Sequence, residues 1–133
     1  HALGFDGLRW HVRAYCHLRK VYRDFAMGRA RNVSISGMPS ERAEMDAEWF
    51  NTVTLLLKPH PKLSPSQREM VEHDYGMEPG RPLEVPCRQA MLFYTLRHLN
   101  LESLEIHDDA ARQHVVIANR EQVEAWLTDV STF

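Results

Sequence analysis

The sequence predicts an α+β fold in which a small β-barrel of the SH3 or Sm-like kind precedes an α/β sandwich-like extension. Short alternating segments separated by glycine and polar residues fill residues 1–38, which is typical of bent strands in a small closed barrel. Strand-like and helix-like segments then alternate over residues 50–133, as they do when helices cover one face of a sheet. The mostly polar residues 39–49 are expected to link the two domains.

The first domain is expected to contain four or five short strands. They cover Ala2–Phe5, Leu8–Cys16, Val21–Met27 and the segment around Val33 and Ile35. Asp6–Gly7 is a two-residue hairpin signal, so the first two strands should pair. Gly28 is expected to mark a bend between strand segments.

The second domain is expected to alternate strands with helices. In order, the segments are a strand Asn51–Pro59, a helix Pro65–Tyr75, a strand Arg81–Cys87, a helix Arg88–Leu99, a strand Gln113–Asn119 and a helix Arg120–Val130. Ser64 should cap the first helix, with Pro65 at its first position and Gln67 completing a capping box. Gly76 should end that helix, and Asn119 should cap the last one.

Composition indicates a folded chain without a membrane span. Of its 133 residues, 44% are hydrophobic and 26% are charged, and no run approaches the length that spans a bilayer. The chain begins with His1 rather than Met, so we expect a fragment of a longer protein. Cys16 and Cys87 lie far apart in apolar-periodic stretches, which favours reduced, buried thiols of a cytoplasmic protein over a disulfide.

Charge is distributed unevenly along the chain. Residues 1–42 contain eight basic and three acidic residues, a net charge of +5, whereas residues 43–133 contain eight basic and 15 acidic residues, a net charge of −7. Seven of the eight early cations are arginine, whose planar guanidinium matches phosphate and stacks on bases. The first domain is therefore expected to bind anions.

The strand Leu8–Cys16 concentrates this charge on one face. Leu8, Trp10, Val12, Ala14 and Cys16 alternate with Arg9, His11, Arg13 and Tyr15. We expect Trp10 in the core and the basic face exposed. If the barrel closes, Arg23 and Arg29 should converge on the same side as Arg13, where their repulsion favours a bound anion. The alternative is that each arginine covers the barrel surface or pairs with Asp6, Asp24 or the acidic second domain.

The sequence gives little support for catalysis. It has no GxSxG, HExxH or glycine-rich phosphate loop, and its eight histidines show no metal-ligand spacing. Asp108–Asp109 beside His107 is the group of residues most similar to an acid–base pair, but its sequence is typical of a turn between two elements. We therefore expect no enzyme, no metal and no cofactor.

Two motifs resemble the WYL domain of bacterial transcriptional regulators. "RWHVRAYC", preceded by "GFDG", resembles its Trp-Tyr-Leu strand, although His11 and Val12 occupy the tyrosine and leucine positions. "YRDFAMGRA" matches the downstream pattern at Tyr22, Arg23, Phe25 and Arg29. The segments "VTLLLKPHPKLSPSQREMVEHDYGM" and "VPCRQAMLFYTLRHL" resemble the C-terminal extension of these regulators.

The resemblance implies a dimeric repressor of the kind found beside anti-phage defence operons. It implies an Sm-like barrel that senses nucleic acid fragments or nucleotides, and a helix-turn-helix outside this chain that binds operator DNA. Matched position by position, the ligand-binding residues would be His11, Arg13, Arg23 and Arg29. Additional candidates are Arg9, Tyr15, Tyr22 and Arg31, with the tyrosines as stacking surfaces. A histidine at position 11 would make binding sensitive to pH.

Other functions remain open at this point. The basic domain could instead dock onto the acidic domain of a second copy, giving an interaction module without a small ligand. A small enzyme would depend on His107 and Asp108, for which the sequence offers no companion groups.

Overall fold

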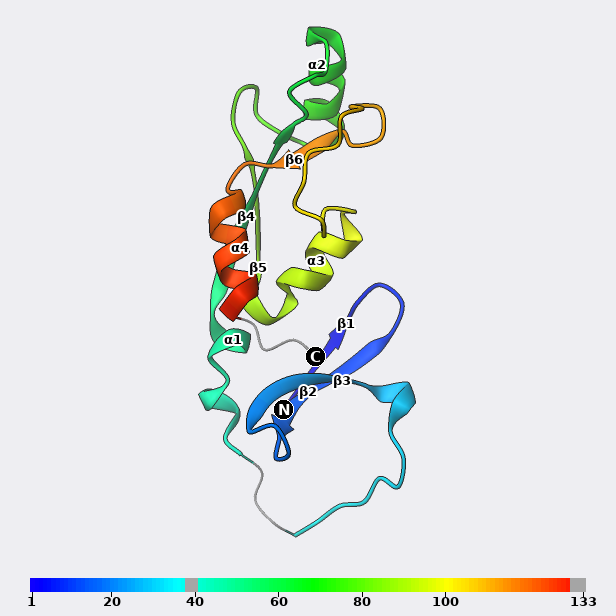
Figure 1. Ribbon diagram of the computed structural model, residues 1–133, viewed down its shortest axis with the longest axis vertical. Helices are drawn as coiled ribbons and strands as arrows, with labels where there is room; N and C mark the ends of the chain where they lie inside the picture. The colour runs from blue at the N-terminus through cyan, green and yellow to red at the C-terminus, as the bar shows by residue number, and fades with distance from the viewer. Residues whose placement is uncertain (38–40, 130–133) are drawn as a thin grey trace.

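The computed structural model describes residues 1–37 and 41–129, which form two antiparallel three-stranded sheets and several short helices. The first sheet has the order β1-β2-β3, and the second has the order β5-β4-β6. In Figure 1 the first sheet lies at one end of the molecule, α2 lies at the other, and α3 lies between them. The predicted α+β class is confirmed.

The described part of residues 1–38 forms an open three-stranded sheet, so the prediction of a small closed barrel is wrong there. Its strands are β1 (Ala2–Phe5), β2 (Trp10–Cys16) and β3 (Val21–Ala26), followed by a 3₁₀ turn η1 (Met27–Arg29). The expected hairpin joins β1 to β2, but its loop spans Asp6–Arg9 rather than two residues, and Gly7 in it has a φ of +91°. The expected strand at Val33 and Ile35 is absent; both side chains are exposed, so no packing favours pairing there.

The second domain follows the predicted order of elements. It comprises β4 (Thr52–Pro59), α2 (Pro65–Asp74), β5 (Leu83–Arg88), α3 (Leu92–His98), β6 (Val115–Ile117) and α4 (Arg120–Asp129). The helix expected from Arg88 begins later, because β5 extends to Arg88 and a 3₁₀ turn η3 (Gln89–Met91) precedes α3. The segment between the domains contains η2 (Ala43–Met45) and α1 (Ala47–Phe50), whereas residues 38–40 lie outside the described part.

Local signals in the sequence explain most of these boundaries. Ser64 and Gln67 form both hydrogen bonds of the predicted capping box, and Pro65 occupies the first turn of α2. Gly76 follows the helix with a φ of +64°. Asn119 directly precedes α4 and its carbonyl accepts from the Val123 N–H, as expected of a cap residue. Its side-chain oxygen accepts from the Leu56 N–H, and its amide donates to the Thr54 carbonyl. It therefore anchors the chain to β4.

The hydrophobic core lies in the second domain. Leu55, Leu57, Leu92, Leu96 and Val123 are each at most 1% exposed and pack between the second sheet, α3 and α4. Tyr94 of α3 links this part of the molecule to the first sheet through contacts with His11 and Asp24. Cys16 and Cys87 are free and partly buried, and burial raises the pKa of the Cys87 thiol.

Candidate functional site

The two faces of the first sheet are reversed relative to the sequence prediction. Directly opposed residues in antiparallel strands share a face, so the register places Leu3, Val12 and Phe25 on one face and Arg13 and Asp24 on the other. Trp10 belongs to the first of these faces and is 54% exposed, so its predicted core position is wrong. We call this the outer face; it comprises Leu3, Phe5, Trp10, Val12, Ala14, Cys16, Val21, Arg23 and Phe25.

Arg13 is the centre of a buried ion-pair cluster. Its Nε and Nη2 donate to Asp46 at 2.8 and 2.9 Å, and Nη2 also donates to Glu48 at 2.7 Å. Nη1 lies 3.5 Å from Asp24 on the neighbouring strand. The Arg13 residue is only 1% exposed, so the prediction of an exposed basic face is wrong at this position. Packing against α1 explains the reversal, because Asp46 and Glu48 lie in that segment.

The electrostatics of the ion-pair cluster (Arg13, Asp24, Asp46 and Glu48) favour the charged guanidinium. Burial acts to lower the pKa of Arg13, but the hydrogen bonds to Asp46 and Glu48 outweigh this effect and raise it. Tyr94 of α3 donates to Asp24 at 3.1 Å. The pKa of Tyr94 is raised, mainly by burial and next by the negative charge of Asp24. The cluster therefore joins β2 and β3 to both α1 and α3.

His11 is also buried, on the face of the first sheet that carries Arg13 and Asp24, which we call the inner face. It pairs with Asp6 in the hairpin turn. Its Nε2 lies 2.8 Å from Asp6 Oδ2, and its ring contacts the ring of Tyr94 with centroids 5.2 Å apart. The Nδ1 atom of His11 has no hydrogen-bond partner in the described residues. Asp6 also accepts from the backbone N–H groups of Leu8 and Arg9 and from the Arg9 side chain.

These contacts keep Asp6 ionised. Burial opposes its charge, but the hydrogen bonds from His11, Arg9 and Leu8 dominate and hold the pKa of Asp6 well below its usual range. The alternative pairing of early cations with nearby carboxylates is therefore realised at Arg9, His11 and Arg13.

The exposed basic groups gather at a different place from the predicted one. Arg9 and Arg29 line one cavity of about 470 Å³ together with Trp10, Ala26, Met27 and Gly28, and we call this cavity the basic groove. The side chain of Arg9 is 42% exposed despite its pair with Asp6, and Arg29 has no ion pair within the described residues. The structure thus brings Arg9 and Arg29 together and places Arg13 apart from them.

The remaining candidate residues are dispersed. Arg23 lies on the outer face opposite Ala14, with no side-chain hydrogen bond to the described residues. Tyr15 and Tyr22 contact each other edge to face, and the Tyr22 hydroxyl donates to the Arg42 carbonyl. Arg31 donates to the carbonyl groups of Gly28 and Ala30 in its own loop.

The residues that hold Arg13 and Asp24 in place are not among those predicted from the sequence. Asp46, Glu48 and Tyr94 come from segments 33 to 81 positions from Arg13. The one available signal is at Asp46, an N-cap residue before a short helical segment, whose side chain accepts from the Trp49 N–H. In residues 1–37 and 41–129, no group of three or more His, Cys, Asp or Glu side chains is placed to hold a metal ion.

Comparisons with known proteins agree with a regulatory module. The chain is similar to the DNA-binding transcriptional repressor CapW of Stenotrophomonas maltophilia, with 56% identity over 97% of this chain and 43% of the relative. CapW of Pseudomonas aeruginosa is 41% identical over 93% of this chain and 41% of its own length. CapW of Escherichia coli strain KTE188 is 38% identical over 96% and 42%. The chain therefore spans about two fifths of the length of these relatives.

The relatives carry the name of a repressor rather than of an enzyme, in agreement with the prediction of a non-enzymatic module. A family described as the C-terminal dimerization domain of the BrxR transcriptional regulator matches residues 52–123, which include the whole second sheet and its core. This chain therefore belongs to the family of BrxR transcriptional regulators through residues 52–123, which match the C-terminal dimerization domain of that family.

Proposed function

We propose that this chain is the ligand-sensing and dimerisation region of a cytoplasmic, DNA-binding transcriptional repressor. The relatives are repressors by name and are more than twice as long as the segment they share with this chain. Operator binding is assigned to residues outside this chain, in a helix-turn-helix that precedes it. The acidic second domain, which contains the family's dimerization region, would hold two copies together.

The proposed ligand is a nucleic acid fragment or a nucleotide, bound in the basic groove. The observation that carries this proposal is the meeting of two arginines and an exposed tryptophan around one cavity. Guanidinium groups bind phosphate in a bidentate manner, and an indole ring stacks on bases. Arg23, on the same outer face as Trp10, is a further candidate for a phosphate contact.

His11 and Arg13 are proposed to position the groove rather than to touch the ligand. Arg13 holds β2 against α1, and His11 holds Asp6, which in turn binds Arg9. Loss of either contact would shift the strand that carries Trp10.

Binding of a labelled single-stranded oligonucleotide at several salt concentrations tests this function. Affinity should fall steeply between about 50 and 200 mM salt, with a log–log slope of about −0.7 for each phosphate contacted. Arg29→Ala should weaken binding and reduce the slope by about one contact. Arg19→Ala, in the exposed β2–β3 turn, is the matched control and should change neither. No binding at low salt would refute the nucleic acid ligand.

A protein-interaction module without a small ligand is the second candidate. The outer face exposes Leu3 (59%), Phe5 (49%) and Phe25 (43%) beside Trp10, an apolar patch of the kind that marks interfaces. Sedimentation at low and high salt separates two versions of this candidate. A dimer held by the oppositely charged domains should dissociate as salt rises, whereas one held by the outer face should persist.

A further inference from the structure

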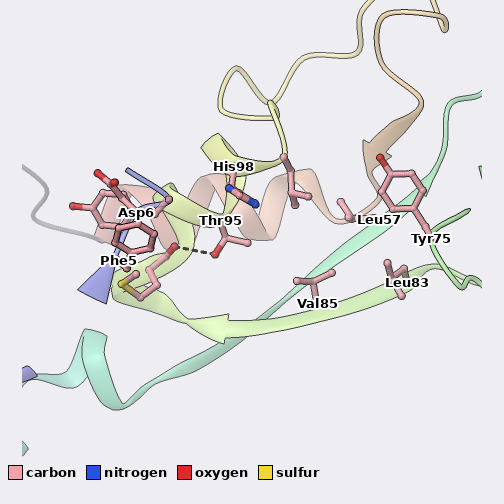
Figure 2. Close-up of a pocket in the computed structure, with 12 residues that line it drawn as sticks. Phe5, Asp6, Leu57, Tyr75, Leu83, Val85, Thr95 and His98 are labelled. Carbon is pink, nitrogen blue, oxygen red and sulfur yellow. Dashed lines mark hydrogen bonds between the residues drawn. The ribbon is translucent and has the colours of Figure 1, made fainter. Parts of the chain in front are cut away.

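A second cavity lies between the two domains. It has a volume of about 580 Å³ and is bounded by the β1–β2 turn (Phe5–Gly7) on one side and by β4, β5 and α3 on the other. It shares no lining residue with the basic groove. Figure 2 shows Val85 and Leu83 of β5 facing Thr95 of α3 across this space, with His98 and Tyr75 nearby. We call it the junction cavity.

The size and walls of the junction cavity suit a small apolar molecule. Its volume falls in the range of about 300 to 1,000 Å³ that is typical of ligand pockets. Leu57, Leu83, Val85 and Leu99 supply aliphatic walls, and the thioether of Met91 adds a polarisable surface that favours aromatic rings. The rings of Phe5 and Tyr75 line it as well. A ring-bearing body therefore fits these walls best.

Most polar groups of the cavity are already engaged by the protein. Asp6 accepts hydrogen bonds from its own turn and from His11, and Tyr94 donates to Asp24. The Thr95 hydroxyl donates to the Met91 carbonyl, the bond drawn in Figure 2. Among the described residues, the His98 imidazole and the Tyr75 hydroxyl are the lining groups with no such partner.

Within the described residues, the polar lining of the junction cavity leaves an unpartnered donor for an anionic head group on the ligand. The one carboxylate in the lining is Asp6, which is already paired with Arg9 and His11. The one basic side chain in the lining is His98. Gly7 sits directly against this ring, since a Cβ at Gly7 would lie 3.3 Å from His98 Nδ1. The imidazole thus lies between the turn and an apolar space, where it can donate to a carboxylate.

We propose that the junction cavity binds a small aromatic carboxylate, with its ring between β5 and α3 and its carboxylate on His98. This site is separate from the basic groove and does not depend on the nucleic acid ligand. Its walls come from both domains, so an occupant contacts the β1–β2 turn and the second sheet together. Such a ligand would stabilise this arrangement of the domains by mass action.

Calorimetric titration of the chain with 2-naphthoate tests the proposal. The wild type should bind, and His98→Ala should weaken binding roughly tenfold or more, because a hydrogen bond to a charged group is lost. The neutral analogue 2-naphthamide should bind the wild type more weakly and should be little affected by His98→Ala. Val85→Trp, which fills the cavity, should abolish binding.

The controls separate this site from the other surfaces. Arg29→Ala in the basic groove and Arg23→Ala on the outer face should leave 2-naphthoate binding unchanged. His98 is exposed, so His98→Ala should keep the wild-type melting temperature and remains informative even if Val85→Trp fails to fold. Absence of binding, equal affinity of His98→Ala and wild type, or loss of binding in Arg23→Ala would overturn the proposal, and none of these results bears on oligonucleotide binding.

Discussion

Arg13 and Asp46 lie 33 residues apart in the sequence and form a buried bidentate ion pair, with Nε–Oδ2 and Nη2–Oδ1 distances of 2.8 and 2.9 Å. Their side chains are 2% and 1% exposed. Asp46 also accepts a hydrogen bond from the Trp49 N–H at the start of α1. One carboxylate thus joins the second strand of the first sheet to the segment that leads into the second domain.

Removing Arg13 should strongly destabilise the chain. Arg13→Met removes the guanidinium from the buried carboxylates and leaves Asp46 with the His1 imidazole and Asp24 with the Tyr94 hydroxyl. Breaking a buried pair in this way costs about 3–5 kcal/mol. Urea denaturation followed by circular dichroism measures the change in the free energy of unfolding. The same measurement on Asp46→Asn and on the double variant should give a coupling energy of about 0.5–3 kcal/mol. Independent, additive effects would contradict a direct pair.

Asp6 should stabilise the fold at neutral pH and lose this effect in acid. The pKa of Asp6 is lower in the folded chain than in the unfolded chain, where an aspartate carboxyl group has a pKa of about 3.9. The folded state therefore binds fewer protons, and the contribution is present above that value and disappears as the pH falls through the lower folded pKa. Asp6→Asn should melt below the wild type at pH 7, and the difference should shrink in acid.

Melting temperatures between neutral and acidic pH measure this effect. Asp108→Asn is the matched control, because its side chain is fully exposed and its only described ion pair is with Lys62. A difference between Asp6→Asn and the wild type that stays constant across the pH range would count against a lowered pKa of Asp6.

Asn119 should contribute more to stability than a surface asparagine does. Its side chain bonds the backbone of β4 at both Thr54 and Leu56, so Asn119→Ala leaves a backbone donor and an acceptor without this partner. The expected loss is about 1–3 kcal/mol in the free energy of unfolding. Asn100→Ala, in an exposed turn, serves as comparison, although its φ of +56° gives it a small effect of its own. Equal losses would show that the β4 contacts contribute little.

Local signals in the sequence predicted much of the fold. The capping box at Ser64 and Gln67, the hairpin around Asp6–Gly7 and the order of elements in the second domain all depend on neighbouring residues, and each is confirmed. The strand expected at Val33 is absent because alternation there is not supported by any packing surface in the described residues.

The site was harder to predict because alternation along β2 defines two faces but not which of them is buried. The apolar side chain of Trp10 favoured its own face, yet Arg13 lies inward because Asp46, Glu48 and Tyr94 approach from later segments. A buried arginine requires such partners, and their positions depend on tertiary packing that spacing in one sequence does not reveal. The cluster of Arg9 with Arg29 likewise depends on where η1 turns after β3.

The roles of Arg29 as a ligand contact and of Arg13 as a structural residue are tested most directly by measuring oligonucleotide binding and urea denaturation for Arg13→Met and Arg29→Ala. Arg29→Ala should lose affinity roughly tenfold or more while keeping wild-type stability, because it removes an exposed phosphate contact. Arg13→Met should lower the free energy of unfolding by about 3–5 kcal/mol. The opposite division, with Arg13→Met stable but unable to bind and Arg29→Ala binding normally, would contradict these roles.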